Sequence, residues 1–108
     1  MLVRILTAVT TVAILAAQIA QAKDWLYCIA PSHAERKLYM SPVFPTDGPT
    51  GSAESAFAAS LSQSYFHFDD VQCPRSDDEA SAMSMQRHTI DFNQEVGNTI
   101  VNLRWRAR

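Results

Sequence analysis

The sequence predicts a small α+β domain, in which a three-stranded antiparallel or mixed sheet carries two helices on one face in the order β-β-α-α-β. Aromatic-rich extended segments come first, apolar residues then recur every three or four positions, and a strictly alternating segment follows. Such a succession of strands and helices packs as two layers around one core. One disulfide, between Cys28 and Cys73, is expected to stabilise this fold.

The first two strands form a predicted β-hairpin. Residues 25–30 are apolar on both alternating faces and rich in aromatic side chains, which is typical of an inner strand. After a turn-like segment at 31–35, residues 37–44 resume an extended pattern. Because Pro42 has no N–H to donate, the second strand is expected to lie at a sheet edge or to end early.

The first helix is predicted to begin at about Ser52, after a loop rich in proline and glycine. Apolar side chains then fall at steps of three or four, which places them on one helical face. These are Ala53, Phe57, Leu61, Tyr65 and Phe68. The helix is expected to fray near Tyr65, and residues 72–75 break the pattern.

The second helix has the strongest terminal signals. Residues 76–79 read as a capping box, with Ser76 as the N-cap and Glu79 reaching back, and Gly97 ends the helix. Its apolar stripe is Ala82, Met85, Thr89, Phe92 and Val96, widened by Met83 and Ile90. Gln86 and Asn93 interrupt the stripe, so they are expected either to bond backbone groups at the helix–sheet seam or to mark a polar spot on an exposed interface.

The last strand is predicted at residues 99–106, where apolar and polar side chains alternate. The side chains expected to face the core are those of Val101, Leu103 and Trp105. Those expected to face solvent are Asn102, Arg104 and Arg106.

Residues 1–22 are typical of a cleavable export signal. A basic start at Arg4 precedes an apolar run, and Ala20-Gln21-Ala22 has the small residues that a signal peptidase needs. The alternative is an uncleaved anchor, because the 18 uncharged residues from Ile5 to Ala22 approach the ~17 that span a bilayer. Cleavage leaves residues 23–108 as one small domain with no stable membrane span, periplasmic or secreted.

The two cysteines of an exported chain predict a disulfide rather than a metal site, which would need four ligands at closer spacing. Intermolecular pairing or free thiols are the alternatives. Because Cys28 falls in the first strand and Cys73 between the helices, the bridge is expected to join the helical layer to the sheet. The two cysteines are not in a C-x-x-C motif, which argues against a redox-active pair.

Charge argues against a nucleic-acid partner. The chain has 9 basic and 11 acidic residues. Removal of the signal takes Arg4 with it, which leaves 8 against 11 and a net charge of −3. Nucleic-acid-binding domains are usually basic instead. The acidic residues Asp77, Asp78 and Glu79 lack the spacing of a calcium loop and suit the start of a helix.

Two clusters of side chains are candidates for a functional site. His67, Asp69 and Asp70 combine an imidazole with carboxylates, as in a general base or part of a metal site, although a polar loop also explains them. Arg104, Trp105 and Arg106 form the best candidate for a contact surface, because arginine binds carboxylates and phosphates bidentately and both residue types are enriched in interface hot spots. A solvated terminal strand whose charges protect a sheet edge is the alternative.

No nucleophile motif, zinc motif or glycine-rich phosphate loop is present in the sequence. The favoured hypothesis is therefore a non-catalytic binding or accessory protein without a cofactor, whose partner is another protein or an anionic envelope component. One alternative is a very small hydrolase or metal-dependent enzyme centred on His67, Asp69 and Asp70. The other is a structural envelope protein with no dedicated ligand.

Overall fold

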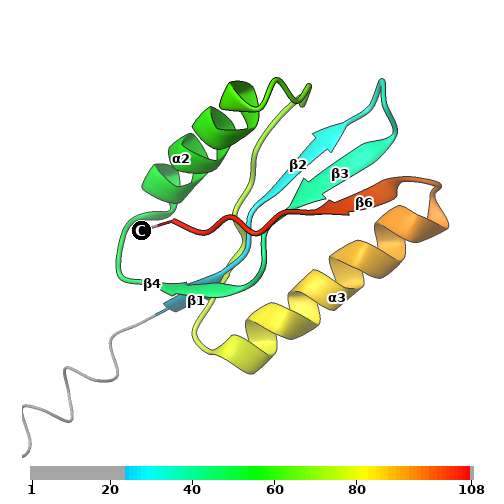
Figure 1. Cartoon of the computed structure of the whole chain (residues 1–108). Coiled ribbons are helices and arrows are strands. Elements are labelled where there is room, and N and C mark those ends of the chain that lie inside the picture. Colours follow the sequence, from blue (N-terminus) through cyan, green and yellow to red (C-terminus); the bar gives the residue numbers. More distant parts are fainter. Residues whose placement is uncertain (1–23, 108) are drawn as a thin grey trace, which may run out of the picture.

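A computed structural model describes residues 24–107, so the predicted export signal at 1–22 lies outside the described residues. The described residues form six short strands and two helices, in the order β-β-β-β-α-β-α-β (Figure 1). The strands are β1 (Asp24–Leu26), β2 (Ile29–Ser32), β3 (Lys37–Met40), β4 (Phe44–Thr46), β5 (Arg75–Ser76) and β6 (Thr99–Asn102). The helices are α2 (Thr50–Gln63) and α3 (Glu79–Glu95). The α+β class is confirmed.

The predicted hairpin is present, but each of its strands is broken once. β1 pairs with β4 and β2 pairs with β3, both antiparallel, and the two registers differ by one residue. The extra residue lies between Met40 and Phe44, which makes this segment a bulge. Here the Ser41 hydroxyl accepts from the Cys28 N–H at 2.8 Å and donates to the Pro42 carbonyl at 2.9 Å. The break at Pro42 agrees with an early end of the second strand.

The long connection between the helices joins the sheet. Asp69 N–H donates to the Pro31 carbonyl, Ile29 and Gln72 exchange two backbone bonds of 2.8 and 3.0 Å, and β5 pairs antiparallel with β1. Sequence patterns did not predict this strand, because its two residues follow Pro74 and show no periodicity.

The Cys28–Cys73 disulfide is present, and its place in the fold corrects one expectation. In the common register of the Ile29–Gln72 and Leu26–Arg75 pairs, the two cysteines lie directly opposite each other on neighbouring chain segments. The bridge therefore joins two segments of the sheet layer, and it does not join a helix to the sheet.

The strands form two three-stranded sheets, whereas one three-stranded sheet was predicted. One sheet has the order β4-β1-β5 and is antiparallel, and the other has the order β2-β3-β6, with β6 parallel to β3. The broken hairpin runs through both sheets, because β1 continues into β2 and β3 into β4. Thus β3 is an inner strand, which pairs with β2 along one edge and with β6 along the other.

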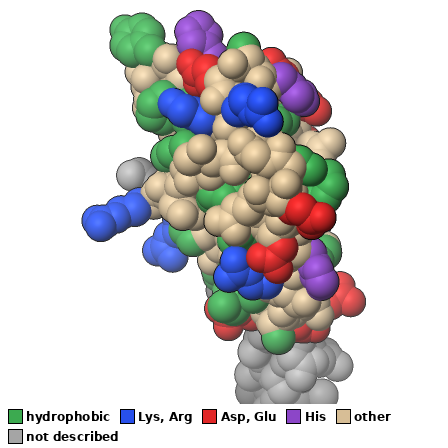
Figure 2. Space-filling model, turned by 90° about the vertical axis from the view of Figure 1, so that its right-hand side faces the viewer, with side chains coloured by type: hydrophobic (Ala, Val, Ile, Leu, Met, Phe, Trp, Pro, Cys, Tyr) green, Lys and Arg blue, Asp and Glu red, His purple; other side chains and the backbone are tan. Residues whose placement is uncertain are grey.

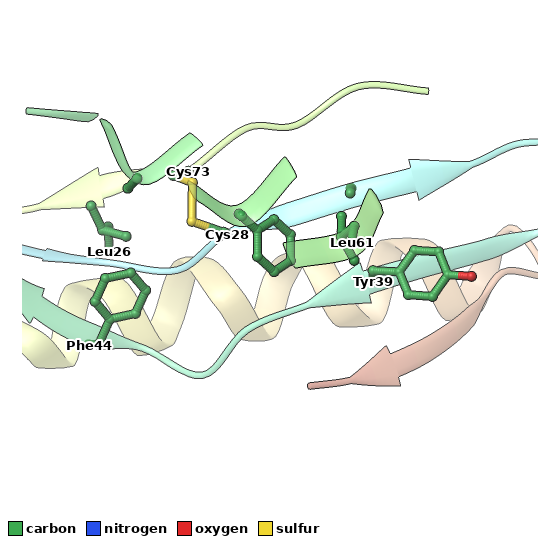
Figure 3. Packing of buried hydrophobic residues seen from close by; sticks show 9 residues of the cluster. Leu26, Cys28, Tyr39, Phe44, Leu61 and Cys73 are labelled. Carbon is green, nitrogen blue, oxygen red and sulfur yellow. A yellow bond between two sulfur atoms is a disulfide. The ribbon is translucent and has the colours of Figure 1, made fainter. Parts of the chain in front are cut away.

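The helices lie on opposite faces of the hairpin, whereas one shared face was expected (Figures 1 and 3). Leu26 and Cys28 pack in the core cluster with α2. Between them, Tyr27 points the other way, and its hydroxyl lies 2.8 Å from the Thr89 hydroxyl of α3. Since successive side chains of a strand alternate, this pair of contacts assigns one helix to each face.

Helix α2 covers the main core as predicted. Ala53, Phe57 and Leu61 are buried along one side of it and pack with Leu26, Tyr39 and Phe44. The helix ends at Gln63, and Tyr65 lies outside the core with 90% of its surface exposed. Phe68 lies beyond the helix but is half-buried and packs against the core, so Tyr65 is the member of the predicted stripe that the core leaves out.

Helix α3 begins two residues later than the predicted capping box. Asp78 is the N-cap, and its carboxylate accepts from the Ser81 N–H at 2.7 Å, whereas Ser76 belongs to β5 and caps nothing. Asp78 and Glu79 thus lie at the helix start as expected, and Gly97 follows the helix end with a positive φ of 93°.

Only part of the predicted α3 stripe is buried. Ala82 is fully buried, but Phe92 and Val96 are 63% and 46% exposed. Along the stripe, exposure increases from Ala82 through the half-buried Met85 and Thr89 to the end of the helix.

Of the two polar residues in the stripe, Gln86 bonds backbone at the helix–sheet seam as expected, whereas Asn93 bonds its own helix. Gln86 donates from Nε2 to the Ser41 carbonyl at 2.9 Å, which is a backbone bond at the seam between α3 and the sheet. Asn93 donates to the Thr89 carbonyl of its own helix at 2.8 Å and accepts from the Asn98 side chain.

Among residues 24–107, no helix is both long and apolar enough to cross a membrane.

Candidate functional site

The segment that follows β6 is only partly paired. Leu103 N–H donates to the Met40 carbonyl at 2.8 Å, and this is the last backbone bond in the series. Arg104, Trp105, Arg106 and Ala107 form no backbone hydrogen bond with another residue that the structure describes. The predicted strand at 99–106 therefore ends at Asn102, and its last residues leave their N–H and C=O groups open to a partner or to water.

Trp105 anchors this open segment to the core. Its ring centroid lies 4.9 Å from that of Phe57 and 5.9 Å from that of Phe44, which it meets edge to face. Val101 and Leu103 pack against the same core cluster, so the predicted inward orientation of these side chains is confirmed. Arg104 and Arg106 are exposed, also as predicted.

A groove of about 1030 Å³ runs along this segment. We call it the terminal groove. Its lining is Pro45, Thr46, Asp47, Gly48, Pro49, Ser52, Ala53, Ala56, Arg104, Trp105, Arg106 and Ala107. One wall is thus the open segment, and the other is the β4–α2 loop with the first turns of α2. In Figure 1 the open segment (red) runs from β6 towards the start of α2.

The lining of the terminal groove favours negative charge. It holds two arginines and one acidic residue, Asp47. The first turn of α2 carries neither a capping side chain nor an acidic residue, so its partial positive charge is not offset locally. On the face shown in Figure 2, acidic and basic side chains are interspersed.

The two groove arginines differ from arginines that have structural partners. Arg75 forms an ion pair with Asp24 at 2.9 Å and donates to the Thr50 hydroxyl at 3.0 Å, and Arg87 pairs with Asp91 one helical turn away. Neither Arg104 nor Arg106 forms an ion pair or hydrogen bond with any other described residue. Their guanidinium groups can therefore bind a carboxylate or phosphate without breaking an existing contact.

The predicted cluster of His67, Asp69 and Asp70 does not assemble as a unit. Asp69 instead pairs with His33, accepting from its backbone N–H at 2.8 Å and contacting Nδ1 of its ring. His67 and Asp70 are exposed, and neither side chain forms a hydrogen bond with another described residue. No group of three His, Cys, Asp or Glu side chains with the arrangement of a metal site occurs within residues 24–107. The His33–Asp69 pair spans 36 positions, so no local spacing could have predicted it.

The His33–Asp69 contact is expected to open in acid. Hydrogen bonds from the backbone and ring of His33 lower the pKa of Asp69 below its ordinary value of 3.8. A lowered carboxyl pKa means that the contact is intact above 3.8 and is lost only as the pH falls through the lower, folded-state pKa. The His33 amide signal in NMR should shift in that acidic range. Asp69→Asn should abolish this transition and Asp70→Asn should keep it; an unchanged transition in Asp69→Asn contradicts the assignment.

A smaller hollow of about 360 Å³ lies at the other end of the molecule. It is lined by Pro31, Ser32, His33, Lys37, Phe92, Asn93, Val96 and Asn98. Sequence reasoning missed it, because Phe92 and Val96 were assigned to the core. Its two basic side chains already have partners, since His33 contacts Asp69 and Lys37 lies 4.0 Å from Glu35.

Comparison with protein families, curated proteins and solved structures finds no match for this chain. The candidate site is therefore interpreted from its own geometry and charge.

Proposed function

We propose that this protein is a small exported binding protein, periplasmic or secreted, which acts without catalysis through the terminal groove. The observation that carries the proposal is the pair of exposed arginines, Arg104 and Arg106, on either side of an anchored Trp105. Export is supported by the signal-like residues 1–22 and by the Cys28–Cys73 disulfide, which is compatible with an oxidising compartment.

The groove chemistry suits a partner with negative charge. Guanidinium groups form bidentate hydrogen bonds with carboxylates and phosphates, and these bonds are about twice as strong as neutral ones. Trp105 offers a rigid apolar surface between the two arginines, which is a combination enriched at binding hot spots. Both expected partner classes, another protein and an anionic envelope component, can supply such groups.

Site-specific photocrosslinking tests this proposal. A photoreactive residue at Ala56, in the groove, should form adducts in the cells that produce the protein, whereas one at His88 on α3 should not. The double change Arg104→Glu and Arg106→Glu should reduce the groove adduct by about tenfold or more, because it replaces two charge-assisted contacts with repulsion.

Arg87→Glu is the matched control, since Arg87 is also exposed but lies outside the groove. It should leave the adduct unchanged. Groove adducts that persist in the double variant would contradict the proposal, provided that its thermal unfolding matches that of the parent protein.

A further inference from the structure

We propose that the terminal groove binds an extended acidic segment of another protein, which adds as a strand beside Arg104–Ala107. This inference rests on the proposed function and names the class of its partner. The recognised pattern is acidic, apolar, acidic at consecutive positions. Three features of the open segment lead to it: its free backbone groups, the alternation of its side chains and the composition of the opposite wall.

The free backbone groups favour a peptide over a compact anion. Residues 104–107 follow β6, which is an outer strand of its sheet, and their side chains alternate between exposed and half-buried as in a strand. They have no backbone partner among the described residues, so their N–H and C=O groups are unpaired there. Strand addition satisfies such a row with main-chain hydrogen bonds that a phosphate or a lipid headgroup cannot supply along its whole length.

The side-chain alternation determines the acidic positions. Arg104 and Arg106 are two residues apart, so both project from the same face of the segment. Directly opposed side chains on paired strands lie about 4.5–5.5 Å apart at Cβ. Carboxylates at alternate positions of an added strand can therefore reach one arginine each.

The opposite wall determines the position between the two acids. That side chain projects to the face on which Trp105 lies, among Pro45, Ala53 and Ala56. These neighbouring side chains are mostly apolar, so an aliphatic side chain of the bound segment is favoured there over a charged one. The terminal groove thus distinguishes alternating from clustered acids.

Two synthetic peptides of identical composition test the inference. One alternates glutamate with valine, and the other groups all glutamates before all valines. In titrations with the mature protein, the alternating peptide should bind at least about tenfold more tightly, because only it can place two carboxylates opposite Arg104 and Arg106. Methylation of all of its backbone nitrogens should abolish binding, since it removes every main-chain donor of the peptide.

The variant Arg104→Glu with Arg106→Glu should lose the preference between the two peptides, while Arg87→Glu should keep it. Equal affinity of the two peptides, or insensitivity to backbone methylation, overturns strand addition. Binding of inorganic phosphate or of anionic phospholipid vesicles that depends on both arginines, without binding of either peptide, overturns this inference and leaves the proposed function intact. Arginine-independent binding of every probe, with groove adducts that persist in the double variant, overturns both.

Discussion

Reduction of the Cys28–Cys73 disulfide is expected to lower the free energy of unfolding by up to about 4 kcal/mol. The bridge closes a loop with a sequence separation of 45, and opening it gives the unfolded chain that conformational freedom back. A domain of this size has a total stability of about 4–13 kcal/mol. The loss is therefore a large share of what holds the protein folded.

The position of the bridge adds a local effect to this global one. The disulfide holds the connection between α2 and α3 against β1 and β2, where the Ile29–Gln72 pair and the Tyr27–Pro74 backbone bond flank it. Hydrogen exchange of Ile29 and Gln72 should therefore accelerate on reduction more than that of the β3–β6 pairs.

Urea unfolding with and without reductant measures the global effect, and the double change Cys28→Ala and Cys73→Ala repeats it without reductant. An unchanged unfolding midpoint after complete reduction would contradict the expected role. Faster exchange along β3 and β6 alone would contradict the local one.

The secondary structure was largely predictable because most elements carry a clear period. Phe57 and Leu61 repeat at helical spacing and are buried, and the alternation of residues 101–105 gave the correct orientation of Trp105. By contrast, β5 has two residues and no period, so only its pairing with β1 reveals it.

The arrangement of the helices was predicted incorrectly although one signal for it was present. Leu26, Tyr27 and Cys28 are consecutive and all apolar, which indicates a strand covered on both faces. Two helices on one face leave the other face open to solvent, so that pattern already favoured one helix on each side. The contact between Tyr27 and Thr89 shows that α3 covers the second face.

The candidate site was only half predictable for a similar reason. Arg104, Trp105 and Arg106 are contiguous, and their alternation is visible in the sequence. The other wall, the β4–α2 loop with the first turns of α2, lies far from them in the sequence, and the packing of Phe44 and Phe57 against Trp105 brings the two walls together. The partner of Asp69 was equally out of reach, because His33 belongs to the turn of the hairpin.

The change Phe57→Ala is expected to destabilise the domain by about 3–5 kcal/mol, as is usual for a buried phenylalanine. Phe57 is fully buried and is the one aromatic residue of α2. Phe92→Ala on α3 is the matched control. Its ring is 63% exposed, so a change within about 1 kcal/mol is expected. Equal losses of stability in the two variants would contradict the assignment of the core to the α2 face.

Phe57 also connects this core to the terminal groove, because its ring lies against Trp105. Since Phe57→Ala removes enough stability to unfold a marginal domain, Phe57→Leu separates the two effects at a cost of about 1 kcal/mol. The leucine variant should remain folded while Trp105 loses the nearer of its two aromatic partners and keeps Phe44. Binding of the alternating acidic peptide should then weaken without a change in the net charge of the groove. If Phe57→Leu binds the peptide as tightly as the parent protein, Trp105 does not need this packing to form the groove, and the two arginines alone determine recognition.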